Sequence, residues 1–294
     1  MRNMFLTAAL ALATPAILSA PAKAETPRAT PTAKPAAKAL AKPVPTVFTC
    51  SNPSSDLIES VNSQNIENLQ TCLTQGADAN AQQGEGFVSA ALRGEIDMVK
   101  AMLPYMNDVA ALERSLAMAA LRGHEEIVDL ILTNPKVTLD LNKPGTRYLA
   151  YAARSGHVNI LRKLVAAGAR DDEGFAMASA IDGGQRSSFD YLLQDAKISP
   201  DAGNGMVLSM AIMSGNKHYV TALLDRGAEA RFFPIVAESL ADIRKHREGS
   251  GPEAAEYKKP VYDEIIALVE AAISKAEIKI ASPITAKPVA PVPL

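Results

Sequence analysis

Short helical stripes of apolar residues, each closed by a turn, alternate along most of this chain. The segment 147–170 shows the unit most clearly. One face of its first helix is apolar at helical spacing, through Leu149, Ala152 and Ala153. Gly156 then supplies the backbone freedom for a sharp reversal. The second helix repeats the spacing with Ile160, Leu161, Leu164 and Val165.

The helix-turn-helix unit recurs along the chain. Its turn positions, 28 to 33 residues apart, are Gln64, Gly94, Gly123, Gly156, Gly184 and Gly215. An apolar residue stands five positions after each turn, and small or β-branched residues such as Ala119 and Ala120 precede it. Two helices this short cannot bury their apolar faces alone, so we expect the copies to stack in a row.

The stretch AARSGHVNILRKLVAAGA at 152–169 resembles the second half of an ankyrin repeat, in which a Gly-His turn leads into the outer helix and Gly-Ala ends it. The resemblance covers about residues 56–280. It implies an all-α, ankyrin-like solenoid of about six to seven helix-turn-helix repeats with disordered ends. Helical solenoids of other families are the alternative, which the Gly-Ala pairs at 76–77, 168–169 and 227–228 disfavour.

This sequence departs from the family at the opening of each repeat. The family's Thr-Pro-Leu-His is absent, and RYLA stands in its place at 147–150. In the family, that Thr and His form hydrogen bonds between neighbouring repeats. We therefore expect apolar packing to take over this role. His124 and His157 directly follow turn glycines, where the family pattern itself prefers His, so we expect them to be structural.

Composition divides the chain into four parts. We expect a signal peptide at 1–24, a Pro/Ala/Lys-rich disordered linker at 25–47, the repeat domain at 48–281 and a disordered Pro-rich tail at 282–294. The last unit, 233–281, departs from the repeat and should form a cap. Its two helices show apolar stripes at Val236, Leu240 and Ile243, and at Val261, Ile265, Leu268 and Ala272.

Residues 1–24 have the three parts of a secretory signal. Arg2 provides the positive start, Phe5–Ala13 begins the apolar run, and Ala22-Lys23-Ala24 provides a small-x-small cleavage site. The segment resembles bacterial signals and predicts a periplasmic protein. An uncleaved anchor is the alternative, but prolines interrupt the short apolar run. No later stretch has 18 consecutive apolar residues, so we expect no integral membrane segment after cleavage.

Cys50 and Cys72 are the chain's two cysteines. An oxidising compartment would join them in a disulfide at the N-terminal edge of the array. The alternative is two separate thiols, with Cys72 filling a core position that is normally Leu in the repeat.

Chemistry-bearing motifs are sparse. The formal net charge of −2, with no basic stripe, argues against a nucleic-acid partner. Asp171-Asp172-Glu173 lacks the spacing of a calcium loop, and we expect it to be a solvated loop tip. His218 and His246 should also be solvated. We expect no cofactor, no metal site and no catalytic residues, because no nucleophile, base and orienting group recur together.

The outward side of the first helices is the candidate binding surface. Stacking should align its residues in rows across a concave face, and a solvated helix would normally show more Lys and Glu there. The candidate residues are Leu92, Arg93, Met118, Leu121, Arg122, Tyr151, Arg154, Met210 and Met213. Packing of some of them against loops or the linker is the alternative.

The sequence therefore predicts a non-enzymatic periplasmic protein that binds another protein through this face. A toxin-neutralising immunity protein is a special case of that binder. The alternative from another class is an envelope-acting hydrolase, with Asp171 and Asp182 as candidate carboxylates.

Overall fold

The structure is a computed structural model that describes residues 48–143, 145–229, 234–249 and 252–281. For 246–249, 252–259 and 276–281 it describes the backbone alone. The expected signal peptide, linker and tail lie outside these ranges. Within them the chain forms α-helices α1 to α14, a 3-10 turn and a π-helical turn, and no strand. The all-α prediction is confirmed.

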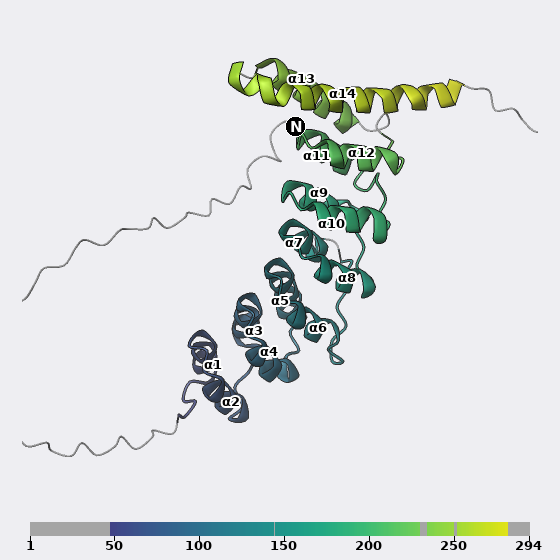
Figure 1. Ribbon diagram of the computed structural model, residues 1–294. Coiled ribbons are helices and arrows are strands. Elements are labelled where there is room, and N and C mark those ends of the chain that lie inside the picture. The colour runs from purple at the N-terminus through teal and green to yellow at the C-terminus, as the bar shows by residue number, and fades with distance from the viewer. Residues whose placement is uncertain (1–47, 144, 230–233, 250–251, 282–294) are drawn as a thin grey trace, which may run out of the picture. The chain divides into compact units, whose positions relative to one another are not determined.

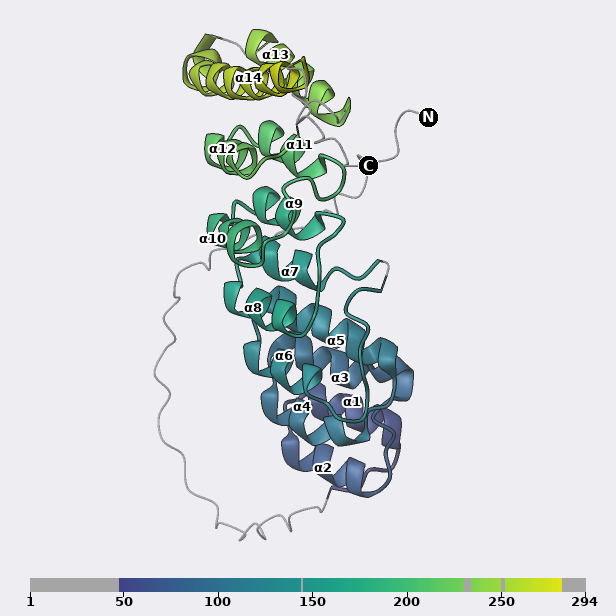
Figure 2. The ribbon, with the colours of Figure 1, turned by 90° about the vertical axis from the view of Figure 1, so that its right-hand side faces the viewer.

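Six helix pairs stack in succession (Figures 1 and 2). The first helices of the pairs, called the inner helices, contact one another in chain order. They are α1 (Pro53–Asn62), α3 (Ala81–Arg93), α5 (Val109–Arg122), α7 (Tyr148–Ser155), α9 (Phe175–Asp182) and α11 (Met206–Met213). In α3, the first residues Gln82, Gln83 and Gly84 have left-handed backbone, so the regular helix begins after them.

The second helices of the pairs, called the outer helices, form a parallel layer. They are α2 (Ile66–Thr74), α4 (Ile96–Met102), α6 (Glu125–Leu132), α8 (Val158–Ala166), α10 (Arg186–Asp190) and α12 (Lys217–Asp225). The 3-10 turn Leu103–Tyr105 extends α4, and the π-helical turn Tyr191–Asp195 extends α10.

The turn inside each pair has left-handed backbone at the position that the sequence predicts. The φ angles are 56° at Gln64, 79° at Gly94, 84° at Gly123 and 81° at Gly156. In the first five pairs, the next residue donates its N–H to a carbonyl five residues back, as His124 does to Ala119 at 3.0 Å. This bond satisfies a helix-end carbonyl that would otherwise be unpaired.

The histidine after a turn ties its pair to the preceding one. His124 Nε2 donates to the carbonyl oxygen of Leu92 at 3.1 Å, and His157 does the same to Leu121 at 3.3 Å. Each imidazole lies directly against the preceding turn glycine: a Cβ on Gly94 would come within 2.5 Å of the His124 ring. The structural role expected for both histidines is confirmed. The expectation that apolar packing alone joins the repeats is wrong.

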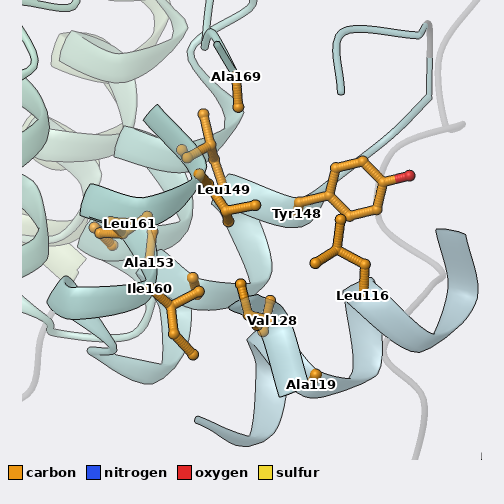
Figure 3. Packing of buried hydrophobic residues seen from close by; sticks show 14 of the residues in the cluster. Leu116, Ala119, Val128, Tyr148, Leu149, Ala153, Ile160, Leu161 and Ala169 are labelled. Carbon is orange, nitrogen blue, oxygen red and sulfur yellow. The ribbon is translucent and has the colours of Figure 1, made fainter. Parts of the chain in front are cut away.

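The core runs between the two layers and from pair to pair. In Figure 3, Tyr148 lies beside Leu116, and Leu149, Ala153 and Leu161 come together within one pair. All of these side chains are buried. Burying one leucine contributes roughly 1.5–3 kcal/mol. Alanines before the turn, fully buried in α5 and α7, allow close contact between inner helices.

Polar side chains in the loops join successive pairs as well. Asn80 Oδ1 accepts from the N–H groups of Asn107 at 2.9 Å and Asp108 at 3.0 Å. Asn142 Oδ1 accepts from Arg170 N at 2.8 Å in the same way. These bonds satisfy backbone donors in segments that have no helical partner.

Helices α13 (Pro234–Gly249) and α14 (Pro252–Ala281) cap the stack. In α13 the expected stripe of Val236, Leu240 and Ile243 is buried against α11. In α14 the expected stripe is partly wrong. Ile265 is buried, but Val261 is 38% exposed, and Ile266 and Val269 complete the buried face instead. None of the helices described combines the length and apolarity needed to cross a membrane.

A disulfide fastens the N-terminal edge of the array. It joins Cys50 to Cys72 of α2, with their Cα atoms 5.1 Å apart. The backbone N–H of Cys50 also donates to Gln75 Oε1 at 3.0 Å. Both cysteines are buried, so the bond fills the core as well as closing a loop.

Replacing Gly94 by Ala should destabilise the protein through two separable effects. Positive φ alone costs about 1–2 kcal/mol, and Gly168→Ala should show only this, because nothing lies within 4 Å of its new methyl group. Gly94→Ala should lose roughly 1–3 kcal/mol more through the clash with His124. Urea denaturation measures both. In a His124→Ala background, Gly94→Ala should cost about as much as Gly168→Ala does. Equal losses at the two glycines in the wild-type background would contradict the proposed contact.

Reducing the disulfide should lower the free energy of unfolding by roughly 3 kcal/mol, because the reduced chain regains loop entropy when unfolded. Denaturation with and without a thiol reductant measures this. A Cys50→Ser/Cys72→Ser variant serves as the control and should match the reduced protein. Identical midpoints under oxidising and reducing conditions would show that the bond contributes nothing.

Candidate functional site

All nine residues predicted to bind a partner lie on inner helices. The set, called the inner-helix face, consists of Leu92, Arg93, Met118, Leu121, Arg122, Tyr151, Arg154, Met210 and Met213. The three arginines and Met213 are exposed, and the other five are half-buried. The alanines one turn away, such as Ala119 and Ala152, are fully buried. The face is therefore the side of the inner helices that points away from the core.

The stack brings part of this set together. Helices α3, α5 and α7 are consecutive neighbours, so their residues form one surface. Met210 and Met213 on α11 are separated from that surface by α9. At equivalent positions α9 presents Ser179 and Asp182, which sequence analysis left out of the site, although the same offset from Gly184 identifies them.

The arginines of the face differ in their contacts. Arg93 donates to the carbonyl oxygen of Val61 at 3.0 Å, on the preceding pair. Arg154 forms an ion pair with Asp182 on the following pair. Arg122 is exposed and has no hydrogen bond or ion pair with any residue the structure describes. A cation without a partner remains free to bind an external acceptor.

The loops that precede α9 and α11 line a cavity of about 990 Å³. Its lining includes the half-buried Phe175, Ile198 and Met206 and the exposed Arg170 and Lys197. The Arg147 guanidinium covers the Phe175 ring, 3.5 Å from the ring centre. Mixed apolar and charged surroundings of this kind suit contacts with a polypeptide.

Asp171 lines this cavity, and its burial contradicts part of the expectation that residues 171–173 form a solvated loop tip. The expected solvated tip holds for Asp172 and Glu173, which are exposed, but Asp171 is buried. Its carboxylate accepts the N–H groups of Ala176 at 2.9 Å and Met177 at 3.1 Å, and so caps α9. Burial raises the pKa of Asp171 to about 6, although these N–H groups favour the ionised form.

Neither carboxylate of the hydrolase alternative is free. Asp171 is held by backbone N–H groups, and Asp182 pairs with Arg154. His218, expected to be solvated, is half-buried and 2.8 Å from Asp190 Oδ1, beside the rings of Phe189 and Tyr219. The side chain of His246 lies outside the described residues. Among those described, no three His, Cys, Asp or Glu side chains come together as metal ligands.

Comparison with known proteins agrees with the stacked pairs. A family model of ankyrin repeats, three copies long, matches residues 87–174 and again 116–204. The chain contains ankyrin repeats over residues 87–204. The matched ankyrin repeats run from α3 to the loop before α11, and therefore include seven of the nine residues of the inner-helix face.

One solved structure that is similar to this chain is the crystal structure of the human ASB11 ankyrin repeat domain, which is 21% identical and has a TM-score of 0.49. The similarity covers 60% of this chain and 85% of that one. No curated protein matches the sequence.

The raised pKa of Asp171 predicts a pH-dependent contribution to the stability of these ankyrin repeats. Between about pH 4 and pH 6 the folded protein keeps a proton that the unfolded chain releases. The contribution therefore falls as pH rises through this window, by as much as roughly 3 kcal/mol, and is constant above it.

Denaturation of the wild type and of Asp171→Asn at pH 4 and pH 7 tests this. The amide cannot ionise and accepts fewer N–H bonds, so the variant should be less stable. The advantage of the wild type over the variant should be larger at pH 4. An advantage that grows toward pH 7 would show that the N–H groups outweigh burial.

Proposed function

We propose that this ankyrin-repeat protein is a non-enzymatic periplasmic scaffold that binds another protein through its inner-helix face. Ankyrin repeats in general mediate protein–protein interaction. The observation that carries the proposal is the alignment of half-buried Leu, Met and Tyr side chains with exposed arginines on neighbouring inner helices. Tyr, Met and Arg are enriched at protein interfaces, and Tyr and Arg are among the residues that contribute most to binding.

The outer helices differ from this face. Some of their cations pair with carboxylates of the neighbouring repeat, as in Lys100 with Glu126 and Lys163 with Asp129. Such pairs suit a surface that remains in water. On the inner helices, Met118 and Tyr151 are half-buried and retain solvent contact. A partner that covered the inner-helix face would bury apolar area that the fold leaves accessible.

Two features support the proposed location. Residues 1–24 have the composition of a signal peptide, and Cys50 is bonded to Cys72. Disulfides persist in oxidising compartments and are rare in the cytosol. Arrays of helix pairs present long rows of side chains, so the inner helices of several repeats would contact the partner together, on what we propose to be the concave side.

Photocrosslinking in intact cells tests the proposal. A benzophenone amino acid at Tyr151 should yield one dominant protein adduct in the periplasmic fraction. The same group at Arg162, an exposed position on outer helix α8 of the same repeat, is the matched control and should not yield that adduct. Adducts of equal yield from both positions would contradict the assigned face. Recovery of the mature protein only from the cytosol would contradict the location.

A further inference from the structure

The distribution of arginine over the repeats is uneven. Residues 48–281 carry 31 Asp and Glu but only 23 Lys and Arg, so the domain is acidic. Three neighbouring inner helices go against this trend: α3, α5 and α7, with the residue that precedes α7, contain no lysine and two glutamates. Their arginines, called the inner arginines, are Arg93, Arg114, Arg122, Arg147 and Arg154.

Carboxylates of the domain neutralise lysines elsewhere. Lys100 and Lys163 pair with acids of the adjacent outer helices, and Lys217 pairs with Glu264 of the cap at 2.8 Å. Lys143 forms an ion pair with Glu113, one of the two glutamates on these inner helices, at 3.1 Å. Acids also pair with Arg170, Arg186 and Arg244, whereas most inner arginines have no carboxylate partner among the described residues.

The inner arginines make contacts of another kind. Arg93 and Arg114 donate to the carbonyl oxygens of Val61 and Gln83. Arg147 covers the ring of Phe175. These contacts hold a guanidinium in place without cancelling its charge. Among residues in the described ranges, a carboxylate pairs with only one inner arginine, Arg154.

The inner arginines alternate with apolar side chains. Leu92 precedes Arg93, Leu121 precedes Arg122, and Tyr151 lies one helical turn before Arg154. Guanidinium groups bind carboxylates through two parallel hydrogen bonds and lose little freedom when they do so. Apolar residues beside them lower the local dielectric constant and strengthen each ion pair.

We propose that the inner-helix face of α3, α5 and α7 binds an acidic polypeptide segment in which carboxylates alternate with large apolar side chains. The inference rests on the proposed function and specifies the chemistry of its partner. The carboxylates pair with Arg122 and Arg93, and the apolar side chains pack on Leu92, Met118, Leu121 and Tyr151. Outside these inner helices, acidic residues outnumber basic residues. This negative charge disfavours a polyanion such as nucleic acid, because it would repel the polyanion along its length.

Fluorescence anisotropy with the full mature protein and synthetic peptides tests the proposal. The probes are three labelled 14-residue peptides that share the same leucines and carry Glu, Gln or Lys at the intervening positions. The Glu peptide should bind about tenfold more tightly than the Gln peptide, and the Lys peptide should bind more weakly still. Binding of the Glu peptide should weaken as salt is raised.

Arg122→Gln is the decisive variant, because Arg122 has no partner in the described fold and its loss should leave the melting temperature unchanged. It should weaken binding of the Glu peptide about threefold to tenfold and leave the Gln peptide unaffected. Arg186→Gln, on outer helix α10, removes an exposed arginine of the opposite layer and is the matched control; it should change neither affinity.

Equal affinity for the three peptides, or equal effects of Arg122→Gln and Arg186→Gln, would overturn the acidic partner. Tighter binding of a labelled single-stranded DNA than of the Glu peptide would overturn it too. The proposed function has a separate readout. If the Tyr151 crosslink persists unchanged in Arg122→Gln at high salt, a partner occupies the face but is not recognised through carboxylates.

Discussion

Ala119 and Ala120 of α5, and Ala152 and Ala153 of α7, are closed to water because two helix pairs pack against each other. Neither pair could exclude water from these residues alone. The same dependence links each pair to the next along the array, so the free energy of the domain is close to a sum over nearest neighbours. The inner-helix face also follows from this mutual burial. The face exists because helices buried on one side align their other side in register.

Close packing between pairs also determines how the polar groups are arranged. The left-handed turn glycine leaves room on its surface, and the following pair fills that room with a ring or an amide. His124 lies against Gly94, His157 against Gly123, and Gln185 against Gly156. Each of the two histidines also donates a hydrogen bond to a helix-end carbonyl of the preceding pair, which fixes the distance between the two pairs. The turn therefore serves both to reverse the chain and to hold the neighbouring repeat.

The repeat register could be read from the sequence because the residues that determine it are few and chemically distinct. Left-handed turn positions call for Gly, and close inner-helix contacts call for Ala, so both leave a clear periodic signal. The buried face of α14 was harder to predict. Its sequence contains two overlapping apolar stripes, and only contact with α12 and α13 decides that Ile266 and Val269, rather than Val261, are buried. Local spacing carries no information about that contact.

Around the candidate site, too, the sequence predicts some features and not others. The nine residues of the inner-helix face follow from a fixed offset to each turn, and the structure places all of them on inner helices. Burial of Asp171 could not be foreseen, because three adjacent acids resemble a solvated tip until the backbone folds α9 around one of them. The pairing of Arg154 with Asp182 likewise depends on how two repeats are aligned.

The disulfide in the first pair affects the two ends of the array differently. A terminal pair has one neighbour where an internal pair has two, so an array of this kind frays from its ends. Cys50 and Cys72 fasten the N-terminal pair covalently, whereas α13 and α14 are held by packing and by bonds such as Ser209 to Ser239. Unfolding would thus begin at the cap and proceed toward the N-terminus. The repeats that carry the inner arginines would be among the last to unfold.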